Sequence, residues 1–338
     1  MRLSPRLQGW LPLLLMGALI VALSAFTATK EEAFLTSFNL NNLLLLAMPL
    51  VLVSLGQTCA LLVGGFDVSV AALMTFCVVV ASFTMAYDKS GLALVTGALV
   101  LVAIGLGTGI FNAVLIRVLK LPSIIATLGT LSILEGAALL LRDHPEGPIS
   151  SGAVDGLTKG VSFVPLAFIA VVVLAVAGDV WLYRSRTGLA TRAVGLDETS
   201  SRRVGMATGW IVVGAFVACS VMASLAGLFL AAQVQIGSPI LDIGFSLESI
   251  ACAVLGGASL AGGRGSFVGA LLAALFLSLI DNVLPLFHQP TEYSQMTIGI
   301  LILLALVLYS APELLARFRT SRAGVGRLDT GDGDPAAG

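Results

Sequence analysis

Long apolar segments dominate the chain and follow one another with few charges between them. A helix needs about 20 apolar residues to cross a bilayer core. Segments of about that length cover residues 10–29, 43–63, 67–87, 92–118, 122–142, 161–183, 209–233, 247–263, 266–287 and 294–311. In lipid, a single crossing segment must pair its own backbone polar groups, which a helix does. The sequence therefore predicts an all-α polytopic membrane protein with about ten transmembrane helices.

Two of the breaks between these segments contain paired glycines, Gly64-Gly65 and Gly262-Gly263. Each break is either a turn between two spanning helices or an interruption inside a broken helix at membrane depth. The stretches GGFDVSVAAL and GGRGSFVGAL, which begin with the two pairs, share several positions. A match this short in apolar sequence is expected by chance, so it does not establish an internal repeat.

Composition excludes several classes of protein. Hydrophobic residues make up 57% of the chain and charged residues 11%, whereas a soluble domain has about 25% charged residues. A net charge of -1 without a basic run offers no surface for nucleic acid. The four cysteines lie in apolar stretches without a CxxC pair, so they are expected to be small core residues and not a disulfide or zinc framework.

The positions of the basic residues predict the orientation of the spans. With the amino terminus inside, only Lys30, Lys89, Arg142 and Lys159 of the 18 lysines and arginines lie outside. Cytoplasmic loops of membrane proteins carry such an excess of positive charge. We therefore expect a cytoplasmic segment 1–9, a transmembrane domain 10–311 and a cytoplasmic, largely disordered tail 312–338. The two longest loops are 142–160 outside and 184–208 inside.

The inner loop contains the sequence DETSSRR from Asp197 to Arg203. Acidic residues come first and basic residues last, the order that stabilises a short helix through its dipole. The sequence predicts a short cytoplasmic helix here.

Motifs for chemistry on small molecules are missing from the sequence. None of the four lysines follows a glycine, so the chain has no Walker A loop to hold the phosphates of ATP. No HExxH metal motif or complete GxSxG motif occurs. We expect no catalytic site and no metal site.

Polar residues inside the apolar segments are costly in lipid and tend to face a cavity or a partner helix. One interpretation places several of them along a hydrophilic path for a polyol; the other is hydrogen bonding between helices. Asp67 has a further alternative, a solvated position at the end of a span. The candidates are Gln57, Thr58, Asp67, Ser69, Asn112, Thr127, Thr130, Glu135, Gln233, Glu248, Asp281 and Asn282.

Glycines cluster in the segment 248–275, where they permit close approach of helices. The six expected to do so are Gly256, Gly257, Gly262, Gly263, Gly265 and Gly269.

Four stretches of the chain, in the expected order, resemble elements of the ribose-type sugar permeases, the membrane subunits of bacterial ABC importers. These are GGFDVSVAAL at 64–73, PSIIATLGTLSILEG at 122–136, TGLATRAVGLDETSSRRVGM at 187–206 and, most specifically, VLGGASLAGGRGSFVGALLAAL at 254–275.

The resemblance implies an inner-membrane importer subunit that works as a dimer with a second permease copy or paralogue. It also implies a periplasmic sugar-binding protein and a cytoplasmic ATPase, which binds ATP and Mg in place of this chain. The predicted inner helix would then couple to that ATPase through Asp197, Glu198, Ser200, Ser201, Arg202 and Arg203.

Several positions depart from the family pattern. Asp197 stands where Asn is usual, Ser200-Ser201 replaces a common Ala-Ala, and Glu135 occupies a position where several relatives have Arg. Asp281-Asn282 replaces a familiar Asn-Asn. An acid in the pocket would alter the choice of sugar, so the sequence leaves the particular sugar open.

Three functions remain, in order of preference. The first is an ABC import permease for a monosaccharide or related polyol. The second is a proton- or sodium-coupled secondary transporter, which the embedded acids suit equally well. A membrane-embedded enzyme is a distant third. The inner loop favours the first, because a secondary carrier needs no helix that docks an ATPase.

Overall fold

A computed structural model describes residues 5–86, 91–150, 160–161, 163–241, 244–290, 293 and 295–300. Its elements are mostly helices, in the order α1 (Pro5–Ala28), η1 (Glu32–Leu35), α2 (Ser37–Leu62), α3 (Val70–Thr84), α4 (Gly91–Arg117), α5 (Ser123–Leu141), β1 (Glu146–Pro148), β2 (Gly160–Val161), β3 (Val164–Pro165), α7 (Leu166–Arg184), α8 (Arg186–Leu196), α9 (Glu198–Arg203), α10 (Thr208–Val234), β4 (Ile236–Gly237), α11 (Phe245–Leu255) and α12 (Phe267–Leu286).

Within these described residues, 6 helices are long and apolar enough to cross a membrane: α2, α4, α5, α7, α10 and α12. Shorter apolar helices cover Pro12–Ala28, Val70–Thr84 and Phe245–Leu255. The prediction of a helical, polytopic membrane protein is confirmed. The number of about ten spans and the orientation of the termini stay predictions. The predicted tail 312–338 and most of the predicted span 294–311 lie outside the described residues.

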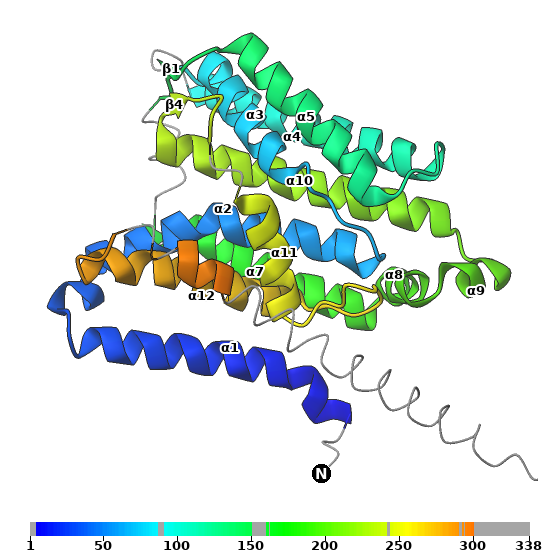
Figure 1. Ribbon diagram of the computed structural model, residues 1–338, viewed down its shortest axis with the longest axis horizontal. Helices are drawn as coiled ribbons and strands as arrows, with labels where there is room; N and C mark the ends of the chain where they lie inside the picture. The colour runs from blue at the N-terminus through cyan, green and yellow to red at the C-terminus, as the bar shows by residue number, and fades with distance from the viewer. Residues whose placement is uncertain are drawn as a thin grey trace, which may run out of the picture.

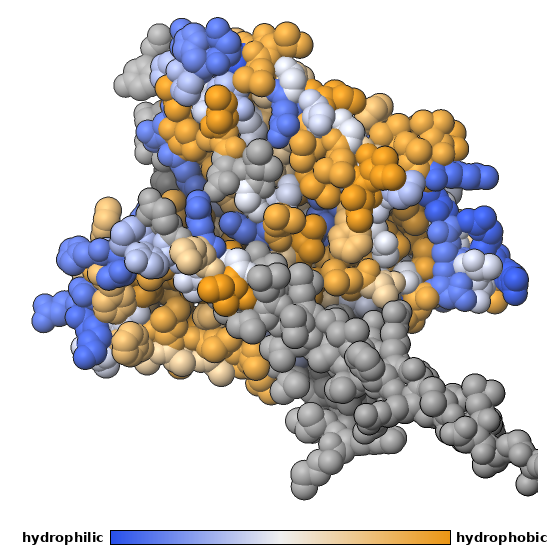
Figure 2. All heavy atoms as spheres, in the orientation of Figure 1, coloured by the Kyte–Doolittle hydropathy of each residue, from blue (hydrophilic) through white to orange (hydrophobic). Residues whose placement is uncertain are grey.

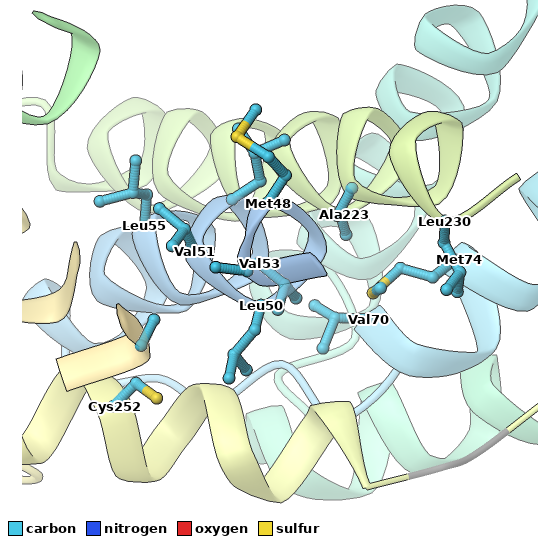
Figure 3. Close-up of a cluster of buried hydrophobic side chains, with 14 of the residues drawn as sticks. Met48, Leu50, Val51, Val53, Leu55, Val70, Met74, Ala223, Leu230 and Cys252 are labelled. Atoms are coloured by element: carbon cyan, nitrogen blue, oxygen red, sulfur yellow. The ribbon is translucent and has the colours of Figure 1, made fainter. Parts of the chain in front are cut away.

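Helix α2 forms the centre of the molecule, and Figure 1 shows it between α10 on one side and α12 on the other. Its side chains Leu50, Val51 and Val53 are almost completely buried. In Figure 3 they lie among side chains of the neighbouring helices, such as Val70 and Ala223. A helix that is apolar on all sides is surrounded either by other helices or by lipid, and α2 is surrounded by other helices.

Polar and apolar surfaces are separated along the helices. Figure 2 shows an apolar band over the middle of the visible face, with hydrophilic residues at its two ends. One end carries α8 and α9 and the other carries β1 and β4, which pair antiparallel. A chain surrounded by lipid over its middle and by water at both ends has this distribution.

Two predicted spans differ from the structure. The segment 67–87 contains α3, which begins only at Val70 and has 15 residues. The segment 247–263 contains α11, which has 11 residues and ends at Leu255. At about 1.5 Å per residue, α11 is about 16 Å long, too short to cross a bilayer. Figure 1 shows α11 inclined steeply to α2 and α12. The prediction of a spanning helix over 247–263 is therefore wrong.

Backbone conformation explains why these helices are interrupted. Gly64, Gly257, Gly262 and Gly263 have positive φ angles between +74° and +100°, which end a right-handed helix. The two irregular segments also meet, because the Gly263 amide donates to the carbonyl of Leu62 at 2.9 Å. The glycine pairs thus form two interruptions that pack side by side.

Candidate functional site

A buried polar cluster lies at the interruption between α2 and α3. It is centred on Asp67, which is 0% exposed. The sequence left open a solvated position for Asp67 at the end of a span, and that alternative is wrong. Neighbouring helices cover most of the irregular backbone from Gly65 to Ser69, whereas Gly64 is exposed. We call Gln57, Asp67, Ser69, Asn112, Thr130 and Ser220 the Asp67 cluster.

The Asp67 carboxylate accepts hydrogen bonds from three residues, which lie just before α3, in α4 and in α10. Ser69 donates from its backbone N at 3.0 Å and from its hydroxyl at 2.5 Å. Asn112 of α4 and Ser220 of α10 each donate to Oδ2 at 3.4 Å. Thr130 of α5 donates to Asn112 Oδ1 at 2.6 Å. The cluster therefore ties the interruption to α4, α5 and α10.

The backbone of Asp67 is bound as well. With its side-chain amide oriented to satisfy both groups, Gln57 of α2 donates to Asp67 O at 3.1 Å and accepts from Asp67 N at 3.3 Å. Thr127 accepts a hydrogen bond from the Val68 amide at 3.2 Å, and Ser246 of α11 donates to Val68 O at 2.7 Å. Side chains from α2, α5 and α11 thus fix the conformation of this interruption.

Neutral donors surround the carboxylate. Throughout the described residues, no Lys, Arg or His side chain contacts Asp67. Amides and hydroxyls arranged around a carboxylate can exchange one hydrogen-bonding partner for another, including the hydroxyl groups of a polyol. The cluster is completely buried, so a solute reaches it only when the surrounding helices move.

The other polar candidates lie elsewhere. Thr58 is buried in α2 and its hydroxyl donates to Ser54 O of the same helix. Glu135 is half-buried in α5, and no hydrogen bond or ion pair joins its side chain to another described residue. Glu248 is half-buried in α11. The structure therefore does not bring these three side chains into the Asp67 cluster.

Asp281 and Asn282 lie near the opposite end of α12 from its first residues. Asp281 is exposed, and Asn282 exchanges two hydrogen bonds with Asn39 of α2, at 3.0 Å and 3.2 Å. These residues are separate from the Asp67 cluster.

The glycines of 248–275 allow backbone contacts that a side chain would prevent. A Cβ on Gly269 would lie within 1.9 Å of Gly256 O, so α12 packs directly against the end of α11. A Cβ on Gly262 would lie 2.6 Å from Gly195 O. Gly265 is less constrained, with its closest neighbour 3.3 Å away on Leu62. Gly257 lies near Pro12 and Gly263 near Leu196.

Helix α9 covers Glu198–Arg203, in agreement with the helix predicted over 197–203. Asp197 is its N-cap and accepts from the backbone N of Ser200 at 3.0 Å. These hydrogen bonds with Ser200 lower the pKa of Asp197. Ser200 is exposed, whereas Ser201 is buried against this chain. Ser200 is therefore the serine that a partner can contact.

Glu198 joins α9 to two long helices. Its carboxylate accepts two hydrogen bonds from Arg117 of α4, at 2.7 Å and 3.1 Å, and one from Thr208 of α10 at 3.2 Å. Arg202 of α9 itself donates at 2.6 Å. Hydrogen bonding from Arg117, with a smaller part from Arg202, lowers the pKa of Glu198 to about 2. We call Arg117, Glu198, Arg202 and Thr208 the Glu198 cluster.

A cavity of about 480 Å³ opens beside this cluster. Its lining is mostly polar and includes Ile116, Arg117, Lys120, Glu198, Thr199 and Arg202. Arginine and lysine outnumber the single carboxylate, so the cavity suits an acidic group of a partner surface.

Sequence patterns did not single out Ser220 and Arg117 of these clusters, or Asp179, which contacts the start of α12. Ser220 is one of many small residues in an apolar helix, and nothing in its neighbourhood distinguishes it. Arg117 was counted only for orientation. Asp179 of α7 was overlooked, although it accepts from Phe267 N at 2.7 Å and from Ser266 Oγ at 2.8 Å at the start of α12. The sequence does offer a signal for Asp179, because it is an acidic residue inside an apolar segment, close to the end that carries Arg184.

Comparisons with known proteins agree on the kind of protein. A family model described as branched-chain amino acid transport system / permease component matches residues 39–306. The autoinducer 2 import system permease protein LsrC of Yersinia enterocolitica is 31% identical over 296 residues, which are 86% of this chain and 81% of that protein. The protein of the same name from Enterobacter sp. is 33% identical over 293 residues, 86% of this chain and 84% of that protein. The one from Photorhabdus laumondii is 32% identical over 268 residues, 77% of this chain and 78% of that protein. No solved structure matches the chain.

Proposed function

Because the chain belongs to the permease-component family of branched-chain amino acid transport systems and is a permease subunit of an ABC importer, we propose that it carries a monosaccharide or a related polyol across the inner membrane. The resemblance to the ribose-type sugar permeases is confirmed at the level of the superfamily. Membership also favours an ABC importer over a proton- or sodium-coupled secondary transporter.

An importer of this kind includes an ATP-binding subunit and a periplasmic binding protein. The proposal assigns ATP and Mg to the ATP-binding subunit, since the sequence has no Walker A loop. It also includes a second permease, either a copy of this chain or a paralogue, packed against the apolar surface within the membrane.

The observation that carries the proposal is the Asp67 cluster. Four of its side chains come from α2, α4, α5 and α10, and they converge on one interruption of the helices. Polar groups buried within an apolar bundle cost free energy unless they are hydrogen-bonded, and an ionisable residue inside a membrane protein tends to mark a solute path. We assign to them part of the solute path, which is closed in this conformation. When the path opens, hydroxyl groups of the solute replace some of these hydrogen bonds.

Helix α9 is assigned the role of coupling to the ATPase. Its exposed Ser200 and its basic end, Arg202 and Arg203, provide a surface beside the basic cavity. Docking of an acidic ATPase surface there would transmit closure of the ATPase to the permease.

A second candidate solute follows from the relatives, whose names describe import of autoinducer 2. Identities of 31% and 33% over most of the chain favour this solute enough to test it beside a sugar. The identity of a solute depends on a few side chains, so such overall similarity supports the transport class more strongly than the solute.

The test is uptake of labelled ribose and of autoinducer 2 by cells that produce the permease with its ATP-binding subunit and binding protein. Asp67→Asn keeps the size of the side chain and removes its charge, and we expect uptake to fall while the membrane level stays normal. Asp143→Asn is the control, because Asp143 is an exposed acid beyond the end of α5 and pairs with His144 instead of the cluster. Ribose uptake supports the sugar, and uptake of autoinducer 2 alone replaces it by the second candidate. Unchanged uptake in Asp67→Asn would remove the cluster from the path.

A further inference from the structure

The two clusters at Glu198 and Asp67 are held by the same pair of helices. Arg117 of α4 and Thr208 of α10 bind Glu198. Asn112 of α4 and Ser220 of α10 bind Asp67. At about 1.5 Å per residue, Asn112 lies about 7 Å along its helix from Arg117, and Ser220 lies about 18 Å from Thr208. Each helix therefore connects α9 with the buried carboxylate.

Helices α4 and α10 pack closely enough to move together. A Cβ on Gly105 would lie 2.9 Å from Ser220 O, and a Cβ on Gly109 would lie 2.6 Å from Val217 Cα. These glycines are four residues apart and face the partner helix, the arrangement that allows the closest approach of two helices in a membrane. A displacement of one helix will therefore displace the other.

Glu198 is the main lateral connection of α9. In the part of the chain that the structure describes, the side-chain hydrogen bonds that leave α9 for other elements all end on Glu198. Those of Asp197, Ser200 and Arg202 stay within α9 and its cap. The two hydrogen bonds with the Arg117 guanidinium fix direction as well as distance.

We infer that Glu198 is a positioning residue that transmits movement of α9 through the α4–α10 pair to Asp67. The inference rests on the proposed function, because it takes the ATPase as the source of the movement. When the ATPase displaces α9, Arg117 and Thr208 follow. Asn112 and Ser220 then shift relative to Asp67, and the closed cluster opens.

The test uses complexes of the full-length permease with its ATP-binding subunit in lipid nanodiscs and proteoliposomes. Val68→Cys, next to Asp67, reports opening through its rate of maleimide labelling with and without ATP and vanadate. The same complex with Val68 retained gives the background from the native cysteines. A parallel measurement gives ATP hydrolysis and uptake of ribose or autoinducer 2 by the same preparation.

The variants are Glu198→Gln, Arg117→Met and the double variant. We expect assembly and ATP hydrolysis to persist, while labelling stops responding to nucleotide. Uptake per ATP should fall about tenfold, as for loss of a charge-assisted hydrogen bond. The double variant should be no worse than the worse single one, because both remove one contact. Arg117→Lys should retain part of the response, since lysine keeps the positive charge but cannot donate two parallel hydrogen bonds to the Glu198 carboxylate.

Lys30→Met is the matched control. Lys30 is exposed and carries the same charge as Arg117, but it does not line the cavity beside the Glu198 cluster. Its response to nucleotide should equal that of the unaltered protein.

The possible outcomes distinguish failure of the inference about Glu198 from failure of the proposed transport function. Nucleotide-dependent labelling that survives Glu198→Gln, or additive losses in the double variant, would overturn the inference. Loss of assembly in Glu198→Gln would also overturn it, because the pair would then serve docking. If the unaltered permease does not bind the ATPase, the proposed function itself fails. If labelling responds to nucleotide but neither solute is taken up, the solute is wrong and the inference stands.

Discussion

The close contact between α4 and α10 predicts that alanine substitutions at two glycines of α4, Gly107 and Gly109, change the stability of the protein in opposite directions. Gly109 faces α10, where an added Cβ would lie 2.6 Å from Val217 Cα and 3.0 Å from Phe216 O. Gly107 is exposed, and an added Cβ would meet nothing within 4 Å. Replacing each by alanine adds the same methyl group to the same helix.

The expected magnitude follows from the distances. An ordinary carbon contact is about 3.4 Å or longer, so the backbone at Val217 must retreat by about 0.8 Å to accept the methyl group of Gly109→Ala. Overpacking against backbone costs about 1–3 kcal/mol. The helical preference of alanine over glycine contributes up to about 1 kcal/mol in both variants and cancels in their difference. Gly109→Ala should therefore be less stable than Gly107→Ala by about 1–3 kcal/mol.

The assay is unfolding of both variants in the same mixed detergent, followed by tryptophan fluorescence against increasing dodecyl sulfate. Uptake measured in parallel should fall only in Gly109→Ala, because a displaced α4 moves Asn112 away from Asp67. Equal unfolding midpoints for the two variants, or a higher midpoint for Gly109→Ala, would refute the close packing of α4 on α10.

Three further predictions concern the ends of helices. Asp179→Ala should lower the unfolding free energy by about 2 kcal/mol in the same detergent assay, because it removes the acceptor for the backbone amides of Phe267 and Val268 at the start of α12; Asp143→Ala, at an exposed acid, should leave it unchanged. Hydrogen bonding holds the pKa of Glu198 at about 2, below the value of about 4.3 expected in an unfolded chain. The stability lost in Glu198→Gln should therefore be constant from pH 8 to about pH 5 and disappear as the pH falls through about 4 towards 2, which unfolding measured across this range will check. Ser200→Trp should give a folded protein that fails to copurify with the ATPase, whereas Ser201→Trp should reduce the folded yield itself, because Ser201 is buried.

Hydropathy predicted the long helices well, because a spanning helix needs only length and apolar side chains. Helices α4, α7 and α10 fall within a few residues of the segments expected from the sequence. The same criterion failed at α11, where an apolar composition continues past Leu255 although the helix stops. Hydropathy does not register the positive φ of Gly257, Gly262 and Gly263. Backbone conformation, not composition, sets those boundaries.

The sequence identified most side chains of the Asp67 cluster but not their arrangement. Gln57, Asp67, Ser69 and Asn112 stood out as polar residues in apolar segments, and the structure brings them together. Periodicity could not show that Ser220 joins them, since a serine on an apolar helix usually bonds its own backbone.

The ion pair between Arg117 and Glu198 could not be predicted from the sequence, for a different reason. Arg117 and Glu198 are 81 residues apart, and each had a sufficient local explanation, one as a charge that orients a span and the other as the acidic start of a short helix. A single sequence offers no means of choosing among the arginines near that loop.

The depth of the two clusters explains why one is built from neutral groups and the other from charges. At Glu198, near the polar end of the molecule, water lowers the cost of holding charged side chains together, and the two hydrogen bonds from Arg117 fix α9 in direction. At Asp67, an arginine partner would form a strong pair in a medium of low dielectric, which resists separation. Hydrogen bonds of 3.4 Å from Asn112 and Ser220 are weaker and can be exchanged for those of a solute. A transporter that is driven by a separate ATPase subunit needs both kinds of contact. The Glu198 cluster holds α9 rigidly to the helices, and the hydrogen bonds of the Asp67 cluster can be exchanged for those of the solute.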